Sequence, residues 1–240
     1  MTTERQTARK SNAAGSAEAC SGQVKCVIFD MDGTLTQTNQ LIYDSFNDIA
    51  RRYVGYTFSV PEITAMFGPP EEGALVRIVG KENLDRAMEE YLHFYRTHHS
   101  RLARIYPGIV DVLRFLKERR CVIALFTGKG RSTTGITLEE FDLTSYFDMV
   151  VTGNDVVNHK PAGEGIQKVL DAFSLSPKET LMVGDSVSDV KAAREAGVRI
   201  ASVLWDSYGK EKVLQMGSDE VFHSMEEFSS WLRRNVCRPA

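Results

Sequence analysis

Five short segments of this chain are apolar at nearly every position. They are residues 26–29, 121–126, 148–153, 180–185 and 199–205. A strand that is apolar on both faces belongs in a sheet covered on both sides, as parallel sheets are. Helical periodicity fills the stretches between them, as in 108–120, 165–173 and 187–197. The sequence therefore predicts an α/β fold with a doubly wound parallel sheet and a Rossmann-like core. A last short strand at 220–223 and a helix at 225–234 are expected to complete it.

One long segment interrupts this alternation. From about residue 41 to residue 104 the chain offers no good strand, whereas 41–54 and 82–102 have helical periodicity. We therefore expect an all-helical insert after the first strand. The predicted organisation is a tail at 1–23, a core at 24–37 and 105–240, and a helical domain at 38–104.

Composition excludes several classes of protein. The chain has 240 residues, 42% of them hydrophobic and 25% charged, which is ordinary for a soluble globular protein. A net charge of -3 favours neither nucleic acid nor an anionic membrane as partner. Residues 1–23 are polar, without the apolar core of a secretion signal, and are expected to be disordered. We expect a cytoplasmic protein, either a monomer or a weak dimer.

The cysteines support this expectation. Cys20, Cys26, Cys121 and Cys237 show no paired spacing that would indicate a disulfide or a zinc site. Cys26 and Cys121 lie in predicted strands, so they are interpreted as reduced core residues.

Polar side chains follow four of the predicted strands. They are Asp30 and Asp32, then Thr127 with Gly128, then Lys160, and finally Asp185 with Asp189. Each alone has an ordinary interpretation as turn or helix-cap chemistry. Together they are expected at one edge of the sheet, because ligands of parallel sheets bind beyond the carboxyl ends of the strands.

This set of residue types predicts phosphoryl transfer. A hard cation such as Mg²⁺ would relieve the repulsion among Asp30, Asp32 and Asp185. One carboxylate would attack phosphorus, and the acid two residues away would protonate the leaving group and then activate water. A lysine and a hydroxyl would neutralise charge on the transferring oxygens.

Three other motif assignments fail on spacing. Gly33 is the fourth residue counted from Asp30, whereas an EF-hand loop needs glycine at the sixth position. Lys129 is followed by glycine and lacks the first glycine of a P-loop. His93, His98 and His99 do not form a zinc motif, and a solvated or insert-facing helix surface is the preferred interpretation.

The segments FDMDGTLT, LFTGKG, HKP and MVGDSVSD, in this order, resemble the four motifs of the haloacid dehalogenase superfamily of phosphohydrolases. The insert is similar to the small helical cap of the phosphoglycolate phosphatase-like and pyrophosphatase-like branch. The resemblance implies that Asp30 is the nucleophile and Asp32 the general acid and base. It implies catalytic roles for Thr127 and Lys160 on the phosphoryl group, and substrate contacts from Gly33, Gly128 and Asn39. It implies a Mg²⁺ site formed by Asp30, Asp32 through its carbonyl, Asp185 and, more remotely, Asp189.

Position 32 narrows the expected reaction. Dehalogenases and phosphonoacetaldehyde hydrolases of the superfamily lack an acid there, and ion-pumping ATPases have threonine. The resemblance therefore implies a Mg²⁺-dependent phosphatase acting on a small phosphorylated metabolite, with 2-phosphoglycolate as the first expectation. An inorganic pyrophosphatase and a sugar phosphomutase stay open as alternatives. A non-catalytic phosphate-binding module is disfavoured, because binding alone has no use for the acid pair.

The sequence departs from the family pattern at two places. Gly128 stands where asparagine is usual in this branch, and Ala162-Gly163 replaces Asp-Pro after the lysine motif. Substrate selection is expected to involve a turn at Gly68-Pro69 near the mouth of the site. Four side chains are candidates for contacts to an anionic leaving group, with a solvated helix face as the alternative for the arginines: Asn39, Arg77, Arg96 and Arg101.

Overall fold

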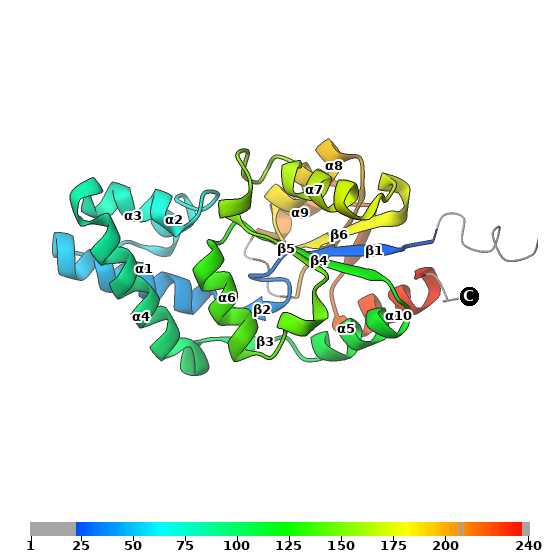
Figure 1. Ribbon diagram of the computed structural model, residues 1–240, viewed down its shortest axis with the longest axis horizontal. Coiled ribbons are helices and arrows are strands. Elements are labelled where there is room, and N and C mark those ends of the chain that lie inside the picture. The colour runs from blue at the N-terminus through cyan, green and yellow to red at the C-terminus, as the bar shows by residue number, and fades with distance from the viewer. Residues whose placement is uncertain (1–22, 206, 208, 237–240) are drawn as a thin grey trace, which may run out of the picture.

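The computed structural model describes residues 23–205, 207 and 209–236 and contains a six-stranded parallel sheet (Figure 1). The strands are β1 (Cys26–Phe29), β4 (Val122–Phe126), β5 (Met149–Val151), β6 (Thr180–Gly184), β7 (Arg199–Val203) and β8 (Glu220–Phe222). Their spatial order is β5-β4-β1-β6-β7-β8, and every adjacent pair is parallel. The predicted α/β class and its parallel sheet are confirmed, and each strand falls within its expected segment.

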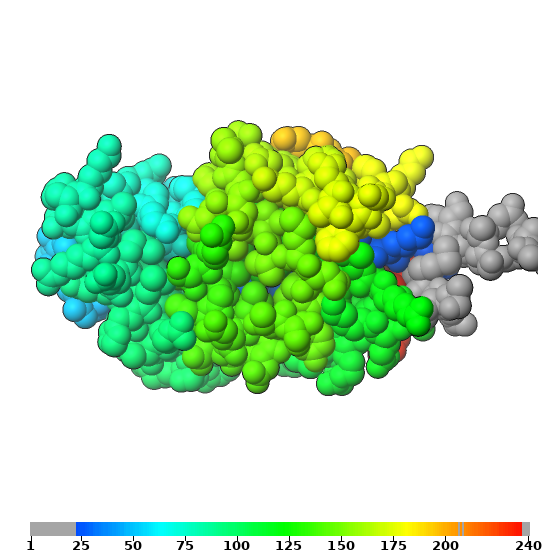
Figure 2. Space-filling view, in the orientation of Figure 1, coloured from blue at the N-terminus to red at the C-terminus, as the bar shows by residue number. Residues whose placement is uncertain are grey.

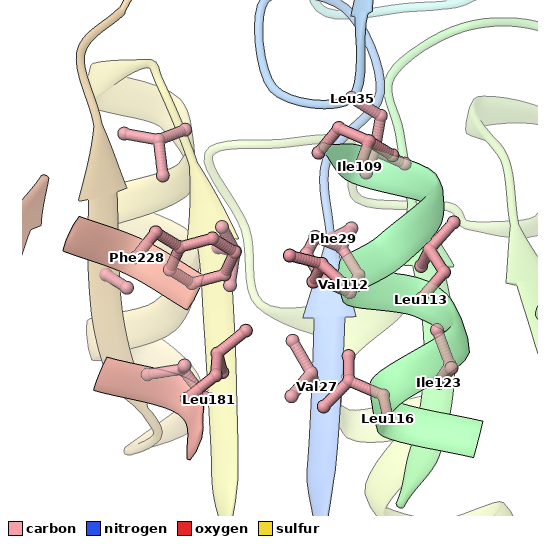
Figure 3. Close-up of a cluster of buried hydrophobic side chains, with 14 of the residues drawn as sticks. Val27, Phe29, Leu35, Ile109, Val112, Leu113, Leu116, Ile123, Leu181 and Phe228 are labelled. Carbon is pink, nitrogen blue, oxygen red and sulfur yellow. The ribbon is translucent and has the colours of Figure 1, made fainter. Parts of the chain in front are cut away.

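Both faces of this sheet are covered by helices, as the apolar strands predicted. In Figure 1, α5 (Ile109–Glu118) and α10 (Met225–Asn235) cover one face, and α7 (Glu164–Phe173) and α8 (Val187–Ala196) cover the other. Alternate residues of β1 therefore enter different cores. Val27 and Phe29 pack with α5 and α10 (Figure 3), whereas Cys26 and Ile28 pack with α7 and α8. This double burial explains why β1 is apolar throughout.

The helices α1 (Asn39–Val54), α2 (Val60–Thr64), α3 (Glu71–Val79) and α4 (Leu84–Leu102) form the insert, which we call the helical unit. It packs around an apolar cluster that includes Phe46, Leu75 and Tyr91 together with Ile136 of the core, and it lies at one end of the molecule in Figure 2. The chain enters and leaves it through β2 (Thr36–Gln37) and β3 (Arg104–Ile105), an antiparallel pair. These strands were not predicted, because a strand of two residues is too short to show a hydrophobic period.

Some further elements were not expected. They are α6 (Arg131–Glu140), α9 (Lys210–Met216) and the 3-10 turns η2 (Lys81–Asn83), η3 (Thr144–Tyr146), η4 (Gly153–Asp155) and η5 (Pro177–Glu179). Three threonines and a glycine give α6 weak intrinsic helix propensity. Tertiary packing stabilises it instead, because Ile136 and Leu138 are buried and Thr137 contacts α4.

Cys26 and Cys121 are buried free thiols, as predicted. Burial raises the pKa of the Cys121 thiol to about 12, so this thiol stays protonated. Cys20, Cys237 and residues 1–22 of the expected tail lie outside the described residues. Among the described helices, none combines the length and the hydropathy needed to cross a bilayer.

Two glycines make a matched test of packing. A methyl group at Gly165 would overlap the ring of Phe126, which is buried in the core, whereas one at Gly135 would meet no atom within 4 Å. We expect Gly165→Ala to lower the free energy of unfolding by about 1–3 kcal/mol through overpacking. Gly135→Ala in α6 should raise it by about 0.4–1 kcal/mol, because alanine restricts the unfolded chain. Urea unfolding midpoints measure both, and equal stability of the two variants would contradict the packing.

Candidate active site

A cavity of about 830 Å³ lies where the carboxyl ends of β1, β4 and β6 face the helical unit. All but one of the predicted site residues line it: Asp30, Asp32, Asn39, Thr127, Gly128, Lys160, Asp185 and Asp189. Gly33 instead packs behind the site, where a side chain would collide with the Asp185 carboxylate. The positive φ of 84° at this position also favours glycine.

The turn after β1 positions the two neighbouring acids. The Asp30 amide continues the sheet by donating to the Val183 carbonyl at 2.8 Å. Met31 and Leu35 are fully buried and anchor the turn, and the Leu35 amide donates to the Met31 carbonyl at 2.9 Å. The acids therefore point into the cavity while the apolar residue between them enters the core.

Lys160 holds the first of these acids. Its Nζ lies 2.8 Å from an Asp30 oxygen and 2.6 Å from an Asp189 oxygen, and 4.6 Å from the centre of the Phe126 ring. Burial would lower the pKa of Lys160, but Asp189 and Asp30 outweigh it and the pKa is raised. Burial raises the pKa of Asp30 to about 7, although Lys160 opposes this shift. A charged lysine thus faces a carboxylate that titrates near neutral pH.

Asp30, Asp185 and Asp189 form an acidic cluster, with one oxygen from each lying within 4.8 Å of the others. Both oxygens of Asp189 are engaged, one by Lys160 and the other by the Ser186 hydroxyl at 2.6 Å. Asp185 is 3% exposed, and within the described residues its carboxylate has no ion pair and accepts only a 3.4 Å bond from the side chain of another residue, Thr34. Burial, together with Asp30 and Asp189, raises the pKa of Asp185 well above its usual value.

This donor set fits a hard divalent cation. A buried carboxylate with no cationic partner is costly unless a positive charge is bound beside it. Asp30 and Asp185 offer oxygen atoms of the kind that such cations prefer. Asp189 is committed to Lys160 and Ser186, so it supports the cluster from behind.

The Thr127-Gly128 loop explains the first departure from the family pattern. The Thr127 amide donates to the Val151 carbonyl at 3.0 Å, and its hydroxyl accepts from the Lys129 amide at 3.2 Å. A side-chain carbon at Gly128 would lie 3.3 Å from the Gly68 carbonyl oxygen. Glycine therefore gives the Gly68-Pro69 turn room to approach, and this turn lines the cavity as predicted.

Asp32 has partners that sequence analysis missed. Its Oδ1 accepts a hydrogen bond from the Thr38 hydroxyl and lies 3.1 Å from the Lys129 Nζ. Lys129 also reaches the Tyr95 hydroxyl at 2.6 Å, and Glu71 accepts from the neighbouring Gly130 amide at 2.7 Å. Lys129 stands in the LFTGKG segment, two residues after Thr127, so the motif held a signal for it. Tyr95 and Glu71 carried none, because helical periodicity marks such positions only as buried.

The expected arginine contacts are not found. Arg77, Arg96 and Arg101 are exposed and do not line the cavity, so the solvated helix face is the correct interpretation. The helical unit contributes mainly apolar side chains to the lining, among them Ile42, Phe46, Met66 and Phe67. The lining cations come from the core: Lys129, Lys160, Lys210 and Lys212. His99 is buried against Phe141 and Thr137, not solvated.

A parallel α/β core with an acid pair, a lysine and further acids at its carboxyl edge defines an enzyme that acts on phosphoryl groups. The chain belongs to the haloacid dehalogenase-like hydrolases, whose family model matches residues 27–203. Within that family it is a phosphatase.

Known proteins are similar over most of the chain. The pyrophosphatase PpaX of Anoxybacillus flavithermus is 32% identical over 209 residues, which cover 87% of this chain and 97% of the relative. The pyrophosphatase PpaX of Halalkalibacterium halodurans is also 32% identical, over 85% of this chain and 95% of the relative. A Haemophilus somnus structure described as a predicted phosphoglycolate phosphatase superposes with a TM-score of 0.76 at 22% identity, covering 88% and 98%. A Thermotoga maritima structure described as a putative β-phosphoglucomutase superposes with a TM-score of 0.70 at 28% identity, covering 88% of this chain and 99% of that structure.

Proposed function

We propose that the protein hydrolyses a small anionic phosphate compound through a phosphorylated Asp30. One observation carries the proposal. Asp30 and Asp32 face the same cavity but have separate cationic partners, since Lys160 contacts the first and Lys129 the second. When two carboxylates have different surroundings, one can act as the nucleophile and the other as the general acid and base.

Each side chain has a defined task in this reaction. An Asp30 oxygen forms a bond to phosphorus while the bond to the leaving group breaks, and Asp32 gives its proton to the departing oxygen. Water then attacks the phosphoaspartate, Asp32 takes a proton from that water, and the bond between Asp30 and phosphorus breaks. Lys160 and Thr127 hold the phosphoryl oxygens throughout.

The acidic cluster is proposed to hold Mg²⁺. Asp30, Asp185 and the Asp32 carbonyl would bind the ion, and Asp189 would orient Lys160 beside it. When bound, the ion supplies positive charge that offsets the repulsion between the carboxylates and the phosphate.

The sequence identities of the relatives rank the candidate substrates. Both PpaX proteins exceed 30% identity over most of the chain, so we place inorganic pyrophosphate first. The motif resemblance alone favoured 2-phosphoglycolate, which becomes the second candidate, because its structural support lies at 22% identity and bears on the fold. Lys210 and Lys212, which line the cavity, offer positive charge to either leaving group. A sugar phosphomutase is the remaining alternative.

A phosphate-release screen separates these possibilities. Purified protein with Mg²⁺ is tested on pyrophosphate, 2-phosphoglycolate, hexose phosphates, nucleotides and β-glucose 1-phosphate. Rapid release from pyrophosphate with much slower release from the others supports the first candidate. Preference for 2-phosphoglycolate supports the second, and movement of phosphate between sugar positions without release identifies a mutase.

We further propose that residues 38–104 act as a cap domain on a core of residues 24–37 and 105–240, in the cytoplasm. The apolar lining from the helical unit would exclude water from the reacting atoms. The paired strands β2 and β3 are proposed as the place where the two parts move relative to each other.

Removal of divalent ions tests the metal site. We expect EDTA to stop turnover and added Mg²⁺ to restore it. Mg²⁺ at about 100 times its dissociation constant should raise the free energy of unfolding by about 2.7 kcal/mol. Because burial raises the pKa of Asp30 to about 7, protons compete with the ion, and the stabilisation should be larger at pH 8 than at pH 6.

Thermal unfolding with and without Mg²⁺ measures this effect at both pH values. Asp185→Asn removes one proposed ligand and is the matched variant. It should lose most of the stabilisation while keeping its fold, since no ion pair of Asp185 is broken in the described residues. Undiminished stabilisation of that variant would contradict the assignment.

A further inference from the structure

We propose that Tyr95 and Lys129 are positioning residues that hold Asp32 in its working orientation, an inference that rests on the proposed role of Asp32 as general acid and base. Lys129 Nζ is 3.1 Å from Asp32 Oδ1 and 2.6 Å from the Tyr95 hydroxyl. The Thr38 hydroxyl donates to the same Oδ1. Among the described residues no partner is found for Oδ2, which is therefore the oxygen left for the substrate.

The link between Lys129 and Asp32 is buried and charged. Lys129 is 7% exposed and Tyr95 is fully buried. Burial would lower the pKa of Lys129, but Asp32, Tyr95 and Glu71 outweigh it, and the pKa is raised. A buried ammonium group needs an acceptor for each of its protons, and the Tyr95 hydroxyl supplies one of these acceptors from the helical unit. Tyr95 therefore fixes where the ammonium group lies.

Tyr95 is in turn fixed by both parts of the protein. It belongs to α4 of the helical unit, and its hydroxyl lies 2.9 Å from the Thr137 hydroxyl on α6 of the core. The Thr137 hydroxyl also lies 3.3 Å from the His99 Nε2. The tyrosine ring stacks on Tyr91 with a centroid distance of 6.2 Å. Tyr95 of the helical unit thus reaches the proposed acid through Lys129, whereas Thr38, directly before α1, contacts it without an intermediate.

Removal of the Tyr95 hydroxyl should therefore affect proton transfer more than binding. Without that acceptor, the Lys129 ammonium group is free to move, and one of the two contacts that hold Oδ1 weakens. Orientation of a catalytic group makes a large contribution to its efficiency. The loss should appear only with leaving groups that need a proton from Asp32.

The test compares two substrates in Tyr95→Phe. An alkyl phosphate needs a proton on its leaving oxygen, whereas p-nitrophenyl phosphate releases a stable anion. We expect kcat/KM for the alkyl phosphate to fall about tenfold, because a hydrogen bond to a charged group is lost. The value for p-nitrophenyl phosphate should change less than about twofold, since kcat/KM reports steps up to transfer to Asp30. Tyr91→Phe, one turn earlier in the same ring stack, is the matched control and should affect both substrates equally.

A double-mutant cycle with Asp32→Asn separates this inference from the proposed function. If Asp32→Asn lowers kcat/KM equally for the two substrates, the general-acid role fails. If Asp32→Asn affects the alkyl phosphate more than p-nitrophenyl phosphate but Tyr95→Phe does not, the positioning role is wrong and Tyr95 is structural. The same conclusion follows if the losses of the two single variants multiply in the double variant. If the double variant loses no more activity than Asp32→Asn alone, Tyr95 acts through Asp32. Lys129→Gln removes the charge but keeps a donor, and it should show the same substrate selectivity even if Tyr95→Phe fails to fold.

Discussion

Asp30→Asn is expected to abolish phosphate release, with a loss of more than about 10⁴-fold in kcat. An amide oxygen is a poor nucleophile, so the bond to phosphorus does not form. The replacement has nearly the same shape, and Lys160 keeps its 2.6 Å contact to Asp189. The loss should therefore reflect chemistry and not a collapse of the site.

Stability measurements provide the control for this variant. Burial raises the pKa of Asp30 from 3.8 to about 7 in the metal-free protein, so the folded state binds this proton more tightly than the unfolded state does. The free energy of unfolding then falls as pH rises from about 4 to about 7. Asparagine does not ionise, so metal-free Asp30→Asn does not lose stability in this way and should be at least as stable as the parent protein at pH 8.

Undiminished turnover by purified Asp30→Asn would contradict the assignment, because it would require another nucleophile. A large loss of stability at pH 8 would instead contradict the expectation that burial of a charged Asp30 destabilises the metal-free protein. Asp85→Asn makes the same chemical change on the exposed surface of α4, away from the cavity, and should keep full activity.

Asp32→Asn is expected to reduce kcat by about 10² to 10⁴-fold while substrate affinity changes little. Asparagine keeps an oxygen that can accept from Lys129 and Thr38, so the side chain should stay in place. It cannot give or take the proton that each half of the reaction needs. The second half needs this proton transfer whatever the leaving group.

This difference between the two halves offers a direct measurement. With p-nitrophenyl phosphate, Asp32→Asn should form the phosphoaspartate at a nearly normal rate and hydrolyse it slowly. A burst of p-nitrophenol followed by slow turnover is the expected kinetic record, and rapid quenching with mass spectrometry should place the phosphate on Asp30. A normal steady-state rate with no burst would show that another group activates the water.

The parallel sheet could be predicted because its signal is local. Each strand is a short apolar run. Asp30, Thr127 and Asp185 come directly after their strands, and Lys160 follows β5 by a short loop. The topology of parallel sheets then brings those ends together. The same reasoning failed for α6, since its threonines and glycine disfavour a helix and only the contacts of Ile136 and Thr137 stabilise it.

The contacts of the proposed acid and base had no comparable signal. The Lys129–Tyr95 bond joins residues 34 positions apart and the Glu71–Gly130 bond joins residues 59 positions apart. In sequence, Tyr95 is one more apolar position on a helix face, and Glu71 is one more acid in a first turn. Only the docking of the helical unit onto the core turns them into neighbours of the site.

By itself, then, the sequence determined the α/β class, the helical insert and the set of residues at the carboxyl edge of the sheet. Hydrophobic periodicity and the order of polar residues along the chain are sufficient for these, because neighbouring residues in a strand or helix have fixed relative directions. The tertiary structure alone decided which cation faces which acid, why Gly128 is small, and that Arg77, Arg96 and Arg101 lie away from the cavity. Those features depend on how separate elements pack against each other, and local periodicity does not encode that arrangement.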